Sequence, residues 1–405
     1  MMAHERTRHA MAVLKQLSAF SPILGLLGHR QVGKTTLLNQ YSTDYLSLDD
    51  IDERERLNEN PKRYVASLKA KNTVIDESQL CPELFPALKE HVRKHPKPGQ
   101  FALSGSIRFT SRKAIQESLT GRIQLIELLP MTISEIEREP LSDRTTNLLQ
   151  SKNLEHTLEG FRISSSVMTQ RQKAIENYLV KGGLPGTCFI RDEAIRRNKL
   201  MDQLMTILDR DLRMVYPTKV AYTGLLEFLR LIAITQGKPF KFQTIKKELG
   251  LAPNTQKQLI HAFESVFLLR TLPIKGEGRA FSVLFEDQGE AQLLAHNMLD
   301  PQTQLAQLLY RNIRAEFFYR LKKTTHFFQY RTRSGVEIPL VIEHDQSVLG
   351  ILPIGALEPS NAEHAAAISL FRTYANSKII FVHSKISQPA AINDRMGIIS
   401  AAALV

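Results

Sequence analysis

The residues of this chain that can do chemistry begin with a glycine-rich loop. The run Gly28-His-Arg-Gln-Val-Gly33-Lys34-Thr35 has the spacing G-x-x-x-x-G-K-[ST] of a phosphate-binding P-loop. Glycines let such a loop bend and bring backbone N–H groups to a phosphate, Lys34 would reach its β- and γ-oxygens, and Thr35 would hold Mg²⁺. The predicted phosphate-binding residues are Gly28, His29, Arg30, Gln31, Val32, Gly33, Lys34, Thr35 and Thr36. The alternative is a glycine-containing turn that matches the spacing by accident.

A pair of acids follows a second apolar run. Asp76 and Glu77 come directly after Thr73-Val74-Ile75, which is the Walker B arrangement. Asp76 would hold the Mg²⁺ shell, directly or through water, and Glu77 would polarise an attacking water. The alternative is a strand end with two solvated acids.

Two further side chains are candidates for contact with a nucleotide. Ser104 ends the apolar run that begins at Gln100, and it is the candidate for sensing the γ-phosphate. Arg122 precedes the strand predicted over 123–129, and it could pair with phosphate oxygens in its own subunit or in a neighbouring one. The alternatives are a Ser-Gly turn that ends a strand and an ordinary surface arginine.

The elements that must position these residues alternate between strand and helix. Short apolar runs are separated by helical stretches over about 130 residues, which predicts an α/β domain with a parallel sheet. Ligands of such sheets bind at the carboxyl ends of the strands. The predicted strands are 23–27, 45–48, 72–75, 100–103 and 123–129.

Composition places limits on the class of protein. The 405 residues are 43% hydrophobic and 23% charged, which predicts a globular chain of two to four domains. The formal net charge of +12 permits a polyanionic partner such as nucleic acid without establishing one. Only Cys81 and Cys188 are present, which suits a reducing cytoplasm, and no apolar run is long enough to predict a transmembrane helix.

With these motifs the chain resembles the bacterial and archaeal AAA-like ATPases that join an AAA_14 domain to a DUF4143 region. The resemblance rests on runs of matching residues at Gly28–Thr36, Leu48–Asp50, Val74–Gln79, Leu103–Ser106, Leu119–Arg122, and Leu129-Pro130 before Glu135. Ser104 replaces the family's usual Thr and keeps the hydroxyl, Thr120 replaces Ala, and His29 stands where Pro is usual. The resemblance implies an AAA-like P-loop ATPase domain over residues 1–150, with ATP and Mg²⁺ as cofactors.

The resemblance and the pattern of the residues together predict how the rest of the chain is organised. Residues 151–221 are expected to form a helical lid, 222–300 a winged-helix domain, and 301–405 a degenerate restriction-endonuclease-like domain. The lid carries the Gly-Gly-Leu-Pro turn at 182–185, where Gly183 and Pro185 are expected close to the nucleotide. The alternative for this turn is a plain helix C-cap followed by proline.

The winged-helix prediction covers three helices, at 225–235, 242–250 and 253–265, and wing strands at 267–272 and 280–285. Its third helix offers four polar side chains where a helix-turn-helix reads base edges, and five lysines between Lys238 and Lys257 suit phosphates. The alternative is a lever that packs on the nucleotide domain. The four polar side chains are those of Asn254, Gln256, Lys257 and Gln258.

The C-terminal segment lacks the acids of a metal-dependent nuclease. In the pattern that the resemblance implies, the metal ligands and the lysine fall on Pro339, Gly355, Leu357 and Arg311. Only one of its acids, Glu316, is retained. Proline and leucine cannot ligate Mg²⁺, so we predict an inactive nuclease-like domain. The alternative is a shifted register in which Glu337, Glu343 and Glu358 form another site.

Together the motifs and the resemblance predict a cytoplasmic, Mg²⁺-dependent, ATP-hydrolysing molecular switch or remodeller. The alternative is a nucleotide-gated DNA-binding regulator with little turnover, and a third hypothesis is an active nuclease. Expected partners are ATP and ADP, with DNA at Lys238–Lys257 and a second copy of the chain as candidates, and no membrane.

Overall fold

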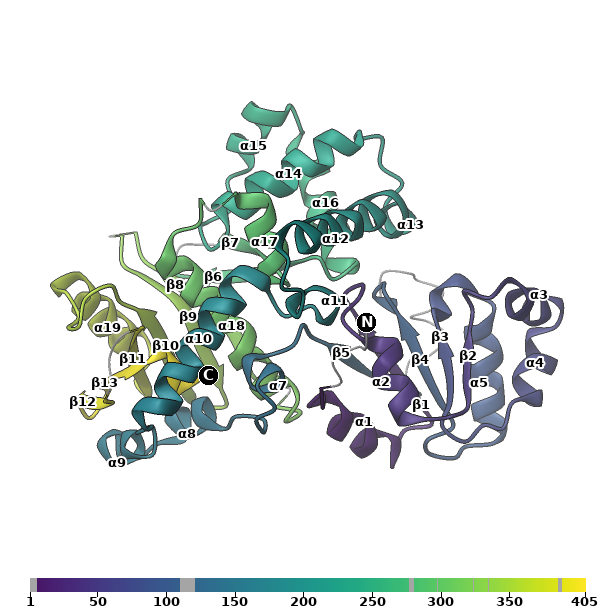
Figure 1. Ribbon diagram of the computed structural model, residues 1–405, viewed down its shortest axis with the longest axis horizontal. Coiled ribbons are helices and arrows are strands. Elements are labelled where there is room, and N and C mark those ends of the chain that lie inside the picture. The colour runs from purple at the N-terminus through teal and green to yellow at the C-terminus, as the bar shows by residue number, and fades with distance from the viewer. Residues whose placement is uncertain are drawn as a thin grey trace. The chain divides into compact units, whose positions relative to one another are not determined.

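The computed structural model in Figure 1 describes residues 6–109, 121–276, 280–296, 298–322, 324–333, 335–384 and 388–405. The chain divides into two compact units, each assembled from separate stretches of sequence. The first unit comprises residues 1–131, 184–222 and 254–269, and the second comprises 132–183, 223–253 and 270–405. Leu119, Thr120 and the wing residues 277–279, on which predictions were made, lie outside the described residues.

The first unit is built on a five-stranded sheet in the order β2-β3-β4-β1-β5, and every strand pair in it is parallel. All six residues of β1 are buried, as expected for a strand covered on both faces. The α/β class with a parallel sheet is therefore confirmed. The strands are β1 Ile23–Gly28, β2 Tyr45–Ser47, β3 Thr73–Asp76, β4 Phe101–Gly105 and β5 Ile123–Leu128.

The helices of the first unit come from all three of its stretches of sequence. In α5 the apolar residues Leu84, Leu88 and Val92 recur every four positions, so one face of the helix is buried. The helices are α1 Ala10–Ser18, α2 Lys34–Tyr41, α3 Ile51–Glu59, α4 Pro61–Ser67, η1 Ser78–Leu80, α5 Leu84–Lys94, α11 Pro185–Cys188, α12 Glu193–Thr206, the π-helical η3 Ile207–Asp211, α13 Leu212–Val215 and α16 Pro253–Ser265.

The second unit is built on a mixed eight-stranded sheet in the order β12-β13-β11-β10-β9-β8-β6-β7. Its strands are β6 Leu269–Lys275, β7 Ala280–Phe285, β8 His326–Arg331, β9 Glu337–His344, β10 Ser347–Pro353, β11 Ser377–His383, β12 Ala390–Asn393 and β13 Met396–Ser400. Its helices are α7 Ile133–Ile136, α8 Arg144–Gln150, α9 Leu154–Glu159, α10 Ser165–Lys181, α14 Tyr222–Thr235, α15 Phe242–Leu249, α17 Gln288–Ala295, α18 Pro301–Phe318, α19 Asn361–Thr373 and α20 Ala401–Leu404. Among the helices of the described residues, none has the length and apolar composition needed to span a bilayer.

The predicted domain boundaries differ from these two units. The helices and strands expected for a winged helix are present, but β6 pairs in parallel with β8, with Ile274 opposite Gln329, and so joins the C-terminal sheet. The third helix, α16, belongs from Asn254 onward to the first unit. The physical reason is burial: Leu272 of β6 and Leu284 of β7 pack into the same core as Leu309 of α18. Boundaries at 221/222 and 300/301 would cut through that core.

Candidate nucleotide-binding site

The phosphate loop connects β1 to α2 and depends on its two glycines. Gly33 begins α2 with a φ of 96°, a left-handed conformation that favours glycine. A Cβ on Gly28 would lie 2.5 Å from the carbonyl oxygen of Leu128 on β5. Both glycines of the motif are therefore required by backbone geometry.

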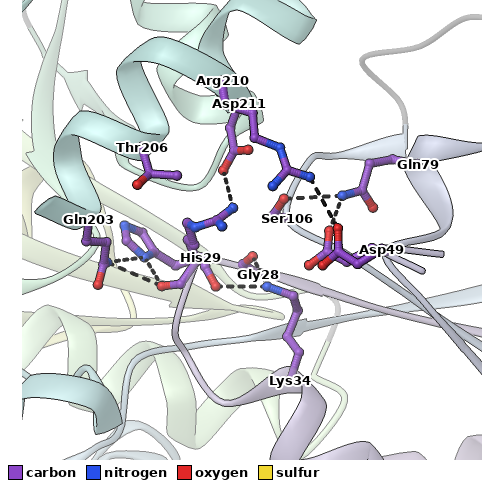
Figure 2. A network of polar contacts seen from close by, with 12 residues as sticks. Gly28, His29, Lys34, Asp49, Gln79, Ser106, Gln203, Thr206, Arg210 and Asp211 are labelled. Atoms are coloured by element: carbon purple, nitrogen blue, oxygen red, sulfur yellow. Dashed lines mark hydrogen bonds and ion pairs between the residues drawn. The ribbon is translucent and has the colours of Figure 1, made fainter. Parts of the chain in front are cut away.

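Lys34 is buried in the first turn of α2 and is held by its own loop. Its Nζ donates to the carbonyl oxygens of Gly28 and His29, each at 3.0 Å (Figure 2). Burial lowers the pKa of this ammonium, while the negative charges of Glu77 and Asp76 act in the opposite direction. The loop thus holds a desolvated cation beside two acids.

Asp76, at the end of β3, is the centre of a hydrogen-bond network. Thr35 Oγ1 donates to its Oδ2 at 2.8 Å, Tyr45 Oη donates to the same oxygen, and Ser104 Oγ donates to Oδ1. The Thr35 hydroxyl and the Asp76 carboxylate are hard oxygen ligands of the kind that Mg²⁺ prefers. No cluster of three or more metal-ligating side chains occurs among the described residues. In proteins Mg²⁺ is commonly held by one or two carboxylates together with substrate phosphates and water.

Glu77 follows Asp76 in a left-handed conformation with a φ of 50°, which is uncommon for a residue other than glycine. Its backbone N–H donates to Asp76 Oδ1 at 2.9 Å, and its carboxylate accepts from Gln79 Nε2. Burial raises the pKa of the carboxyl, and the nearby ammonium of Lys34 opposes that shift. A raised pKa suits a group that takes a proton from water.

Ser104 lies where the sequence places it. It belongs to β4, which pairs with β1 on one side and β3 on the other, so it stands between the phosphate loop and Asp76. The backbone N–H of Glu77 approaches Ser104 Oγ at 3.4 Å. Lys34, Thr35, Asp76, Glu77 and Ser104 are thus brought together at the carboxyl ends of β1, β3 and β4.

Arg122 is not brought to this site within its own subunit. The parallel register pairs Ile23 with Ile123 and Gly28 with Leu128. Arg122 therefore lies at the amino end of β5, roughly 20 Å of strand away from the carboxyl edge that carries the loop. The expectation of a contact in cis is corrected by this geometry, and a contact from a neighbouring subunit stays a prediction.

The Gly-Gly-Leu-Pro turn has two different environments. The N–H of Gly183 donates to Asp287 Oδ2 at 2.7 Å within the second unit, and a contact of Gly183 with nucleotide stays a prediction. Pro185 begins α11 in the first unit, and a Cβ on Gly33 would lie 3.6 Å from its Cγ. Pro185 thus packs on the phosphate loop.

Sequence reasoning missed the helix that lies over the loop. Arg30 Nη1 forms an ion pair with Asp211 Oδ2 at 3.3 Å, and Gln203 Nε2 donates to the Arg30 carbonyl at 3.3 Å. Both partners come from α12 and its π-helical continuation η3, which Figure 2 shows above the loop. Burial raises the pKa of Asp211, and Arg30 opposes the shift. The charged run Asp209-Arg210-Asp211 in an otherwise apolar stretch is the signal that could have found them.

Arg8 was also missed. It is buried, and its guanidinium donates to the carbonyl oxygens of Val32 at 2.8 Å and Leu129 at 2.6 Å. It therefore braces the phosphate loop against the end of β5. No local motif predicts these contacts, because they join residues 24 and 121 positions apart.

The predicted base-reading face of α16 is only partly exposed. Asn254, Lys257 and Gln258 are exposed, but Gln256 is fully buried and cannot reach a base, which corrects that assignment. Tyr216 Oη donates to Gln258 Oε1 at 2.7 Å.

The nuclease pattern of the second unit also needs correction. Leu340 pairs with Ile351, so Leu352 stands opposite Pro339, and β10 ends at Pro353. Gly355 and Leu357 lie beyond the strand, so the positions facing Pro339 are Leu352 and its neighbours, which carry no acid.

The acids that remain in this region have other partners. Glu316 accepts from the N–H groups of Thr145 and Thr146 at the start of α8, and Glu343 pairs with Lys275 at 2.6 Å. The alternative site formed by Glu337, Glu343 and Glu358 is not among the metal-ligating clusters of the described residues, where none occurs.

Comparisons with known proteins find similarity in two parts of the chain. Residues 20–137 match the family AAA_14, described as an AAA domain. Residues 172–279 match a domain of unknown function, DUF8612, where the resemblance predicted DUF4143. Two uncharacterized proteins, from Mycobacterium bovis and Mycobacterium tuberculosis, are each 24% identical over 358 residues, which is 83% of this chain and 71% of theirs.

Solved structures show more distant likeness. The Walker-type ATPase of Pyrococcus abyssi is 15% identical, with a TM-score of 0.44 over 72% of this chain and 99% of its own. A STAND protein with a tetratricopeptide repeat sensor from Pyrococcus horikoshii is 11% identical, with a TM-score of 0.28 over 79% and 48% of the two chains. AMPPCP-bound DnaA from Aquifex aeolicus is 18% identical, with a TM-score of 0.24 over 63% and 84%. Residues 20–137 of this chain are thus similar to the AAA domain family AAA_14.

Proposed function

We propose that the first unit binds ATP with Mg²⁺ and hydrolyses it. The observation that carries this proposal is the network at Asp76, which receives Thr35 and Ser104 while Lys34 and Glu77 lie beside it. These are the residue types that position a phosphate, a metal ion and a water for phosphoryl transfer.

Each residue has a role in this proposal. Lys34 and the loop N–H groups bind the β- and γ-phosphates, and Ser104 contacts the γ-phosphate. Thr35 and Asp76 would hold Mg²⁺, which supplies charge neutralisation on the phosphate oxygens. Glu77 orients the attacking water and accepts its proton, and its raised pKa supports that role.

The difference between bound ATP and bound ADP is proposed to be transmitted from the site through η3. The site would then act as a molecular switch. Arg30 stands inside the phosphate loop and pairs with Asp211 of η3. η3 is a π-helical turn that continues α12, and such turns are frequent at functional sites. A phosphate that attracts Arg30 would compete with Asp211 for its guanidinium.

The proposal is tested by phosphate release from the full chain in ATP and Mg²⁺. Lys34→Ala is expected to lose both ATP binding and turnover, whereas Glu77→Gln is expected to keep ATP binding and lower turnover by about 10²-fold or more. Lys62→Ala is the matched control, because Lys62 is 74% exposed and pairs only with Glu90 among the ion pairs of the described residues. Wild-type turnover no faster than that of Lys34→Ala would refute hydrolysis.

A second candidate function is nucleotide-gated binding to DNA. Lys238, Lys241, Lys246 and Lys247 are exposed in the second unit. Phosphate contacts by these lysines predict an affinity for duplex DNA that falls steeply with salt. Gel shifts over a salt series, with and without ATP, test this function, and the absence of any shift at low salt would exclude it.

A further inference from the structure

The second unit contains a pocket of about 280 Å³ that the ATPase proposal does not use. It lies between α18, the end of α14 and the strands β9 and β10, all within one unit. Pro339 and Leu352, which face each other across β9 and β10, line it. Of the positions to which the nuclease resemblance assigned metal-binding acids, Pro339 lines this pocket.

Two buried glutamine side chains line this pocket. Gln307 is 3% exposed, and neither of its amide atoms has a hydrogen-bond partner among the described residues. Gln329 is also 3% exposed, and its Nε2 donates to the Gly237 carbonyl at 3.0 Å, while its Oε1 has no partner in the same part of the chain. A buried amide without a partner destabilises a fold, so these two side chains point to a group that pairs with them.

The orientation of these amides defines what such a group must offer. Because the Gly237 carbonyl can only accept, it fixes Nε2 of Gln329 and leaves Oε1 as an acceptor. Gln307 presents one donor and one acceptor in either orientation of its amide. The matching ligand edge therefore carries at least one N–H donor next to a carbonyl acceptor.

The remaining walls of the pocket favour an uncharged ligand over a polyanionic one. Leu272, Leu284 and Tyr310 provide apolar surface suited to a flat ring. The charged residues of the lining are Asp300, Glu337 and Lys238, which leave a net negative charge unfavourable to phosphate groups.

We propose that this pocket binds a neutral planar heterocycle with a lactam edge, of the kind found on guanine and uracil. A glutamine amide pairs with such an edge through two hydrogen bonds, as Gln and Asn amides pair with base edges in nucleic-acid recognition. This site goes beyond the proposed ATPase because it lies in the other unit and uses none of the phosphate-loop residues. The ligand is a free base or nucleoside, since the acidic rim disfavours nucleotides.

Equilibrium dialysis of the full chain against guanosine and uridine tests the proposal and distinguishes a purine from a pyrimidine ligand. N1-methylguanosine and N3-methyluridine are the chemical controls, because methylation removes the lactam N–H donor. We expect saturable binding of at least one unmethylated nucleoside and at least tenfold weaker binding of its methylated form. The same titration on Lys34→Ala is expected to be unchanged, because nucleosides carry no phosphate for the loop.

Gln307→Leu is the decisive variant, since it removes donor and acceptor while keeping the volume close to that of glutamine. It is expected to weaken nucleoside binding at least tenfold without lowering the melting temperature, because it also removes an unpaired amide. Gln304→Leu is the matched control on α18, as Gln304 bonds to the Leu299 carbonyl and does not line the pocket. Thr303→Phe, at the half-buried rim, is a second variant expected to block entry.

Three outcomes would overturn the proposal. They are the absence of binding of either nucleoside at millimolar concentration, equal binding of the methylated forms, and unchanged binding by both Gln307→Leu and Thr303→Phe.

Discussion

At the scale of single residues, the charged side chains of the proposed catalytic centre are buried or partly buried, and each lies beside opposite charges or hydrogen-bond donors. Lys34 is desolvated between two acids, and Asp76 receives three hydroxyl donors. Asp211, outside this centre, is likewise a buried carboxylate, and its ion-pair partner is Arg30. A buried charge that loses its partner costs more than the pair contributes.

The Arg30–Asp211 pair yields a stability prediction. Arg30→Ala leaves the Asp211 carboxylate, 3% exposed, without its ion-pair partner, so we expect the free energy of unfolding to fall by about 1–3 kcal/mol. The double variant Arg30→Ala with Asp211→Asn is expected to recover part of that loss, because the amide carries no charge. Urea unfolding measures both.

Arg210→Ala is the control for this pair. Arg210 and Asp49 form an ion pair at 3.4 Å, but both side chains are more than a third exposed, so the expected change is below about 0.5 kcal/mol. An Arg30→Ala protein as stable as wild type, or a double variant less stable than the single one, would contradict the assignment.

At the scale of elements, the turn at the end of α10 is a structural joint. Gly182 has a φ of 71°, and a Cβ there would lie 2.3 Å from Asp287 Oδ1 and 2.5 Å from Gly289 N. Asp287 in turn accepts from the N–H groups of Gly183, Gly289 and Glu290, which ties the turn to the start of α17. The plain C-cap, weighed as the alternative for this turn, accounts for the glycine pair.

Gly182→Ala tests this joint. The clash and the left-handed backbone together are expected to lower the free energy of unfolding by about 2–4 kcal/mol, as measured in urea. Gly160→Ala, at the C-cap of α9, is the matched control, because its φ is −67° and the nearest atom to a Cβ is 3.4 Å away. Equal stability of the two variants would show that the turn tolerates a side chain.

At the scale of the whole molecule, the chain passes repeatedly between two units that each require distant segments. The core of the second unit joins Leu148 of α8 and Leu158 of α9 to Leu349 of β10 and Ile380 of β11. A fragment that ends at one of the predicted domain boundaries would therefore expose apolar residues that are buried in the full chain.

Residues 301–405 expressed alone test this organisation. Without β6, β7 and the helices α8 to α10, the fragment loses one edge of its sheet and a large part of its core. We expect no cooperative thermal transition in near-ultraviolet circular dichroism, whereas the full chain melts cooperatively. A sharp transition in the fragment would restore the predicted boundary at residue 300.

The local motifs were predictable because their geometry depends on neighbouring residues. Gly28 to Thr35 forms a strand–loop–helix over a few positions, and Asp76 ends its strand where the apolar run stops. The parallel order of the sheet then brings Ser104 between them. The helices and strands expected between 222 and 286 are likewise present.

What the sequence by itself determined is therefore the chemistry of the phosphate loop and the α/β class of the unit that carries it. Only the tertiary structure decided that Arg122 faces the wrong edge of the sheet, that Gln256 is buried, and that β6 and β7 extend the C-terminal sheet. It also decided that Asp211 meets Arg30, 181 positions away, and that Gln307 lines a pocket. The reason is that motif geometry is local, whereas register, burial and cross-chain pairing depend on which distant apolar surfaces share a core.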